Sequence, residues 1–221
     1  MSDHPKTLTT LDFLAMKRAG RKIVSLTAYD ALMARMLDAS GVDLILVGDS
    51  VNQVVAGRSS TLSATLDQMI YHAKAVQGAV RRALVVVDLP FLSYQVTPED
   101  AIRNAGRVLQ ETDAAAVKLE GGVTMAPTIR ALVERGIPVM GHIGLTPQSV
   151  HALGGYRVQG REEAAAMRLL ADAHAVEGAG AFSVVFELVS ASLVAMVAGL
   201  RLVGLLGLSG LGLGLMRPAS A

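Results

Sequence analysis

The chain has 221 residues, of which 20 are basic and 19 acidic, so its formal net charge is +1. This balance argues against a nucleic-acid-binding surface, and the length suits one large α/β domain with a sizeable core. The chain contains no cysteine, which excludes disulfide bonds and thiolate metal sites and makes a cytoplasmic location the expectation. Residues 1–7 lack the apolar segment of a signal peptide, so we expect none.

Short apolar runs alternate along the chain with segments of helical periodicity. Segment 9–19, within an N-terminal helical segment 1–20, has the pattern of a short amphipathic helix. Asp30 and Thr97 are placed as helix N-caps, and the long polar loop 146–161 is predicted to be functional. A second loop is expected over 50–61. The remaining pattern predicts strands at 22–28, 42–48, 83–89, 114–119, 138–144, 182–188 and 202–206, and helices at 31–39, 63–79, 98–111, 124–135, 161–177 and 190–200.

A strand followed by a helix, repeated without hairpin signals, predicts a parallel sheet with right-handed crossovers. The polar residues follow strand after strand instead of gathering at one point of the sheet. A closed ring explains this spread, because an open doubly wound sheet concentrates its ligand groups at one switch point. We therefore predict a (β/α)8 barrel, with the open sheet as the alternative.

Three carboxylates stand where apolar strands end. Asp49 follows the run 44–48, Asp88 ends the run 84–88, and Glu120 follows 114–119. The C-terminal ends of parallel strands are the side on which such folds place their chemistry. Each acid taken alone has an alternative role as a helix cap, but three together indicate a site. Because no cysteine is available, these oxygen donors favour Mg²⁺, with Mn²⁺ or Co²⁺ as alternatives.

Lys118 stands two residues before Glu120, so both side chains are expected on the same face of their strand. A lysine directed into a barrel needs an anion, either a substrate carboxylate or a neighbouring acid. The alternative is that Lys118 extends out of the barrel, which requires another strand register.

Glu187 and His142 are two further candidates. The apolar run 182–186 before Glu187 gives surroundings suited to a general base, with capping or ion pairing as the alternative. His142 is a candidate for an acid–base or orienting role, and structural histidines are equally common at strand ends. Three loop arginines are candidates for holding an anionic group, although most such arginines are solvated: Arg58, Arg157 and Arg161.

A divalent metal, a lysine and a shielded base suit one reaction type. The metal chelates an α-keto acid through its carboxylate and carbonyl oxygens and so acidifies the neighbouring carbon. The base then removes a proton from that carbon, and the resulting enolate attacks an electrophile.

Several motifs of the chain form a recognisable set. They are Val47–Ser50, Asp88–Phe91, Val117–Gly122, Gly141–Gln148 and Gly154–Arg161, together with the stretches 60–62 and 69–72. The most specific are the Lys-Leu-Glu-Gly-Gly and Gly-His-Ile-Gly-Leu-Thr-Pro-Gln runs. Together these motifs resemble the ketopantoate hydroxymethyltransferase (3-methyl-2-oxobutanoate hydroxymethyltransferase) family, in register from about residue 8 to about residue 200.

The resemblance implies a (β/α)8 barrel of the phosphoenolpyruvate/pyruvate superfamily and a Mg²⁺-dependent cytoplasmic enzyme of pantothenate synthesis. It implies transfer of a one-carbon unit from 5,10-methylenetetrahydrofolate to 3-methyl-2-oxobutanoate, giving 2-dehydropantoate. The family forms homo-oligomers, commonly decamers. By position, the resemblance implies Asp49, Asp88 and Glu120 as metal ligands, Asp49, Ser50, Asp88 and Lys118 as keto-acid contacts, Glu187 as proton acceptor, and His142 near the site without an assigned role.

The likeness fails after about residue 200. Within an expected single domain of residues 1–221, segment 201–221 is an atypical apolar tail rich in glycine and leucine. It retains an altered seventh strand but lacks the family's eighth βα unit, so the barrel is expected to be incomplete. Three interpretations of the tail are a truncated or frameshifted product, a membrane-associating segment, or an oligomer contact. The glycines and Arg201 disfavour membrane insertion.

Two alternatives to the active hydroxymethyltransferase follow. One is a non-catalytic or unstable homologue that keeps the site residues but lacks the support of a closed barrel. The other is a different lyase or mutase of the same superfamily that acts on a keto acid, which the loop after His142 disfavours.

Overall fold

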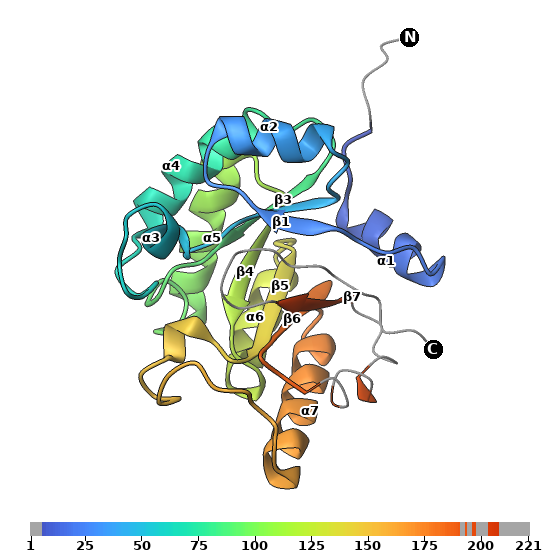
Figure 1. The fold of residues 1–221 in the computed structure, drawn as a ribbon, viewed down its shortest axis with the longest axis vertical. Helices are drawn as coiled ribbons and strands as arrows, with labels where there is room; N and C mark the ends of the chain where they lie inside the picture. Colours follow the sequence, from blue (N-terminus) through green and yellow to red (C-terminus); the bar gives the residue numbers. More distant parts are fainter. Residues whose placement is uncertain (1–5, 191–192, 194–195, 198–202, 208–221) are drawn as a thin grey trace.

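The computed structural model describes residues 6–190, 193, 196, 197 and 203–207. Seven parallel strands form one curved sheet whose spatial order follows the chain from β1 to β7. Figure 1 shows the strands in an arc, with most of the helices around its outer side. The strands are β1 Ser25–Thr27, β2 Leu44–Val47, β3 Leu84–Asp88, β4 Ala116–Glu120, β5 Val139–Gly144, β6 Ser183–Glu187 and β7 Val203–Gly207.

This arrangement confirms the predicted parallel barrel-type fold. In the described part, β1 and β7 are the two edge strands, so seven strands of a (β/α)8 barrel are present there. Segment 208–221 and most of the helix expected over 190–200 lie outside the described residues. The single domain 1–221 therefore stays a prediction. The helices are α1 Thr10–Arg18, α2 Ala31–Ala39, α3 Val51–Val54, α4 Leu66–Gln77, α5 Pro98–Thr112, α6 Ala126–Val133 and α7 Glu163–Gly178, with 3-10 turns η1 Val123–Met125 and η2 Pro147–Ser149.

The local signals at helix starts operate as predicted. Asp30 caps α2 by accepting a hydrogen bond from the Met33 amide at 2.8 Å, and Thr97 caps α5 ahead of Pro98. Two predicted loops were wrong in part. Residues 50–61 contain α3, and the long loop after β5 contains η2. Both elements are a single turn, too short for apolar periodicity to reveal.

Side chains alternate between the two sides of the curved sheet, which explains why its strands are apolar throughout. Outward-facing residues pack against the helices in one core cluster, and inward-facing residues form a second cluster inside the barrel with α1. The outward set includes Ile45, Val47, Val85, Val87, Val117, Leu119, Val139, Ile143, Val184 and Phe186; the inward set includes Leu44, Leu84, Val86, Ala116, Met140 and Val185.

The inward side changes from apolar to charged as the strands run toward their C-terminal ends. Asp88 lies two residues beyond Val86, and Lys118 two residues beyond Ala116. His142 follows Met140, and Glu187 follows Val185, with the same spacing. Because the period of a strand is two, each of these polar side chains faces the barrel interior above the apolar layer.

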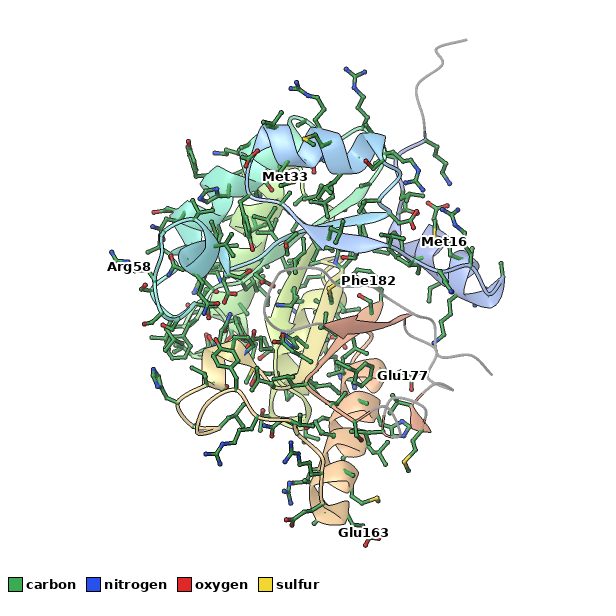
Figure 2. All side chains as sticks on the ribbon, in the orientation of Figure 1. Met16, Met33, Arg58, Glu163, Glu177 and Phe182 are labelled. Carbon is green, nitrogen blue, oxygen red and sulfur yellow. The ribbon has the colours of Figure 1, made fainter. Side chains whose placement is uncertain are left out.

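Helix α1 packs with the apolar layer inside the barrel. Phe13 is fully buried, and its ring meets that of Phe182 edge to face with 6.4 Å between centroids. Figure 2 labels Met16 on α1 and Phe182, and both belong to the inward-facing cluster. Burial of these side chains holds α1 in place.

We predict that Phe13→Ala lowers the free energy of unfolding by about 3–5 kcal/mol, because it opens a cavity in the inward-facing cluster. Urea denaturation followed by circular dichroism measures the change. Leu11→Ala on the same helix is the matched control, since Leu11 is 74% exposed and should change stability by less than about 0.5 kcal/mol. Equal effects of the two substitutions would contradict the packing of α1.

Candidate active site

A buried charged cluster lies at the C-terminal ends of β2 to β6. Its acidic members are Asp49, Asp88 and Glu120, each at most 6% exposed, and Glu187, which is partly buried. Its basic members are Lys118 and His142, which are also buried. The structure therefore brings together these six residues, all of which were site candidates from the sequence.

The Lys118 ammonium pairs with Asp88 across neighbouring strands. Lys118 Nζ donates to Asp88 Oδ1 at 2.6 Å, and both side chains are about 95% buried. The register that aligns Asp88 with Lys118 sets this contact. Burial disfavours the charged amine, but the surrounding carboxylates outweigh burial and raise the pKa of Lys118. The expectation that Lys118 points inward and meets a neighbouring acid is confirmed.

Asp49 lies against Asp88 on the next strand end. Its backbone N–H donates to Asp88 Oδ2 at 3.1 Å. Burial, reinforced by the Asp88 charge, raises the pKa of Asp49 to about 7. The cluster thus concentrates more negative charge at this point than its own cations neutralise.

His142 lies between two carboxylates. Its Nδ1 is 3.3 Å from Glu120 Oε1, and its Nε2 is 3.3 Å from Glu187 Oε2. Neither contact has the geometry of a directed hydrogen bond, so both are ion pairs of the imidazolium. Burial and the Lys118 charge lower the pKa of His142, but the two carboxylates outweigh them and raise it to about 9. Burial opposes ionisation of Glu120 as well, and the His142 charge outweighs it and lowers the pKa of Glu120.

Gly144 allows the ends of β5 and β6 to approach closely. It has φ of +93°, and a Cβ there would lie 2.3 Å from the Glu187 carbonyl oxygen. Leu145 N–H donates to that same oxygen at 2.8 Å. Glycine at this position therefore brings the Glu187 backbone against the strand that carries His142.

Three uncharged residues of the site were missed from the sequence. Gln148, on η2, is buried and hydrogen-bonds Asp49 and Glu120. Tyr94 OH donates to Gln148 Oε1 at 2.7 Å, and Tyr29 OH is 2.8 Å from Ser50 Oγ. The only available signals were that Tyr29 follows the first strand and that Gln148 ends the Gly-His-Ile-Gly-Leu-Thr-Pro-Gln run.

The loop arginines do not join the cluster. Arg58, Arg157 and Arg161 are exposed, and Figure 2 shows Arg58 at the outer edge of the molecule beside α3.

No group of three or more histidine or acidic side chains within the described residues is arranged around a common point as a metal site requires. No helix in the described part of the chain has the length and apolar character needed to cross a membrane.

The fold and the buried cluster define the class of this protein, an α/β-barrel enzyme with its charged site at the C-terminal strand ends. Two solved barrels show the fold alone. A phosphonopyruvate hydrolase has a TM-score of 0.66 at 13% identity, covering 90% of this chain and 72% of its own. A 2,3-dimethylmalate lyase of the PEP mutase/isocitrate lyase superfamily has 0.63 at 20%, covering 95% and 75%.

Sequence similarity then identifies the family. The family model described as ketopantoate hydroxymethyltransferase matches residues 7–210, so the chain belongs to that family. A 3-methyl-2-oxobutanoate hydroxymethyltransferase of Pelobacter propionicus is 55% identical over 89% of this chain and 73% of its own length. The protein of the same name from Corynebacterium glutamicum is 59% identical over 84% and 69%.

We predict that Lys118→Met lowers the free energy of unfolding by about 3–5 kcal/mol, because it leaves Asp88 buried without its cation. Chemical denaturation at neutral pH measures the loss. Lys74→Met is the control, since Lys74 pairs with Glu111 at 3.3 Å on the surface and should cost at most about 1 kcal/mol. A loss of that same small size for Lys118→Met would mean that the buried pair is unimportant.

The raised pKa of His142 predicts that stability falls as pH rises. The folded state keeps the proton up to about pH 9, and the unfolded state only up to about 6.5. The stabilisation from His142 is therefore complete below about pH 6.5 and lost toward pH 9. The pKa of Asp49 is also raised, so its stabilisation is likewise lost as pH rises, in this case toward about pH 7. Urea denaturation in EDTA at about pH 6 and 9.5 should show the decline, and His142→Gln should reduce it. A flat profile for the unsubstituted protein would refute the charged histidine.

Proposed function

We propose that this chain transfers a one-carbon unit from 5,10-methylenetetrahydrofolate to 3-methyl-2-oxobutanoate and so forms 2-dehydropantoate, the first step of pantothenate synthesis. Membership of the family and relatives that are more than half identical support this activity. The observation that carries the proposal is the buried charged cluster, in which Asp88 pairs with Lys118 and His142 lies between Glu120 and Glu187. Such a cluster costs stability, which makes a role in binding and chemistry its best explanation.

The lyase or mutase alternative has weaker support. The superfamily barrels that suggest it are at most 20% identical to this chain and share its fold, and one fold hosts many chemistries. The curated hydroxymethyltransferases match most of the chain at more than half identity. The activity is therefore proposed from the family and the site, and not from the fold.

Family membership indicates a metal-dependent enzyme, and we propose Mg²⁺ held by Asp49, Asp88 and Glu120. The chemistry of the donor set fits a hard divalent cation, because all three side chains are buried and offer only oxygen. The three carboxylates do not surround a common point in the described structure, so holding the cation requires them to close around it. The four carboxylates of the cluster exceed its two cations, Lys118 and His142, by two charges when all are ionised. The oxygens already accept hydrogen bonds, but each keeps a lone pair for a metal. When bound, the cation supplies Lewis acidity that makes the carbon beside a keto group easier to deprotonate.

Keto-acid binding is assigned to the residues on the rim of β2 to β4. We propose that Lys118 offers its ammonium to the substrate carboxylate while it remains paired with Asp88. Ser50 Oγ, oriented by Tyr29 OH at 2.8 Å, is a further hydrogen-bond donor on this rim. The inward direction of Lys118 supports the assignment, because a buried amine that faces carboxylates is already fixed before substrate arrives.

Glu187 is the proposed proton acceptor. It removes the hydrogen from carbon 3 of 3-methyl-2-oxobutanoate, and the electron pair of that bond forms the new bond to the one-carbon unit. A water molecule supplies the hydroxyl oxygen as both bonds between the one-carbon unit and the folate nitrogens break. One nitrogen takes the proton held by Glu187, the other takes the remaining proton of the water, and tetrahydrofolate departs. The ion pair with His142 at 3.3 Å holds the carboxylate in position.

The assembly and location follow the resemblance. We propose a homo-oligomer, commonly a decamer in this family, that works in the cytoplasm on small-molecule substrates. Exposed apolar side chains on α2 support an assembly, among them Met33, labelled in Figure 2.

We predict that Glu187→Gln lowers turnover by a factor of about 10²–10⁴, because the amide cannot accept the proton. The assay follows 2-dehydropantoate formation from 3-methyl-2-oxobutanoate and 5,10-methylenetetrahydrofolate with Mg²⁺. Keto-acid affinity, measured by calorimetry, should change little. Glu163→Gln at the exposed start of α7 is the matched control, and it should keep full activity (Figure 2).

Two results would revise the proposal. Turnover that survives Glu187→Gln would exclude this residue as the base and leave the activity in place. A folded protein without any turnover would favour the non-catalytic homologue that keeps the residues of the site.

A further inference from the structure

The Gln148 side chain connects the ends of β2 and β3 inside the site. It is 6% exposed, and its Nε2 donates to Asp49 Oδ2 at 2.9 Å and to the Leu89 carbonyl oxygen at 3.0 Å. Its Oε1 accepts from Tyr94 OH at 2.7 Å and from Gln95 Nε2 at 3.0 Å. Both amide protons and the amide oxygen are therefore used within the barrel rim.

The orientation of this amide is determined by its partners. The Leu89 carbonyl can only accept a hydrogen bond, so the atom that faces it must be the NH₂ group. The reversed amide would direct its oxygen at that carbonyl and at the Asp49 carboxylate. Gln148 therefore always presents a donor to Asp49.

The backbone of Gln148 acts on a second carboxylate. Its N–H donates to Glu120 Oε2 at 3.0 Å. Tyr94 strengthens the same link, because its hydroxyl also accepts from the Glu120 backbone N–H at 3.1 Å. One residue of the loop after β5 thus holds one oxygen of Asp49 and one of Glu120, 99 and 28 residues away along the chain.

We infer that Gln148 is a positioning residue that orients Asp49 and Glu120 for a divalent cation. The inference rests on the proposed function, which assigns both carboxylates to the metal. The hydrogen bonds use Oδ2 of Asp49 and Oε2 of Glu120. Groups that hold metal ligands in this way determine ligand orientation and basicity, and losing them typically weakens metal binding 10–100-fold.

The test is metal affinity, measured on the metal-free protein by calorimetric titration with Mg²⁺ and, separately, Co²⁺. Gln148→Met keeps the length of the side chain and removes its side-chain hydrogen bonds, including the one to Asp49, while the backbone N–H can still donate to Glu120. The dissociation constant should therefore rise about 10–100-fold through the loss of Asp49 orientation. Gln77→Met is the matched control. Gln77 lies on α4, and its Oε1 is buried without a hydrogen-bond partner in the described structure, so this change should leave metal affinity unaltered.

Tyr94→Phe is a second variant for the case in which Gln148→Met does not fold. It keeps the buried ring and removes the hydroxyl that holds Gln148 Oε1 and the Glu120 amide. We expect weaker metal binding here too, by a smaller factor. A purely structural role for Gln148 would lower the melting temperature of both variants and leave the metal dissociation constant of the folded protein unchanged.

The outcomes separate the two proposals. Weakened binding in Gln148→Met or Tyr94→Phe, with Gln77→Met normal, supports the positioning role. Unchanged affinity in the folded Gln148 and Tyr94 variants overturns that role and leaves the proposed function intact. A parent protein that binds neither cation overturns the metal site itself.

Discussion

Burial of opposite charges inside the barrel is the constraint on which the rest of the structure depends. Lys118 and Asp88 pair at 2.6 Å where almost no water reaches them. An isolated charge would be too costly there, so each group requires its partner in the correct register. The alternation of the strands places the apolar layer below and the charged layer above, and both layers rely on the same inward-facing positions.

The uncharged residues of the rim explain how the cluster holds one geometry. Gln148 links Asp49 to Glu120, and Gly144 lets the Glu187 backbone approach β5. These links join elements that are far apart in the chain, and the bond from Gln148 to Asp49 also connects the ends of β5 and β2, which are not neighbours in the sheet. A site arranged in advance requires less reorganisation when substrate binds, which is the physical basis of electrostatic catalysis.

The comparison with other barrels separates what the fold provides from what the family provides. A phosphonopyruvate hydrolase and a 2,3-dimethylmalate lyase share the fold at 13% and 20% identity. The fold accounts for the location of the charged cluster at the strand ends, because loops there are free to vary while the strands stay packed. Chemistry is specified by particular side chains and not by the fold, so the proposed roles of Lys118 and Glu187 rest on the closer family relationship.

The sequence by itself determined the strands, the helix caps and the inward direction of the strand-end residues. Period-two alternation is a local property, so the spacing of Lys118 and Glu120 was enough to place both on one face. The caps at Asp30 and Thr97 were equally local. Only the tertiary structure decided that His142 lies between Glu120 and Glu187, and that Gln148 bridges Asp49 and Glu120. Those contacts depend on how the curved sheet brings separate strand ends together, and no periodicity within a single strand encodes that distance.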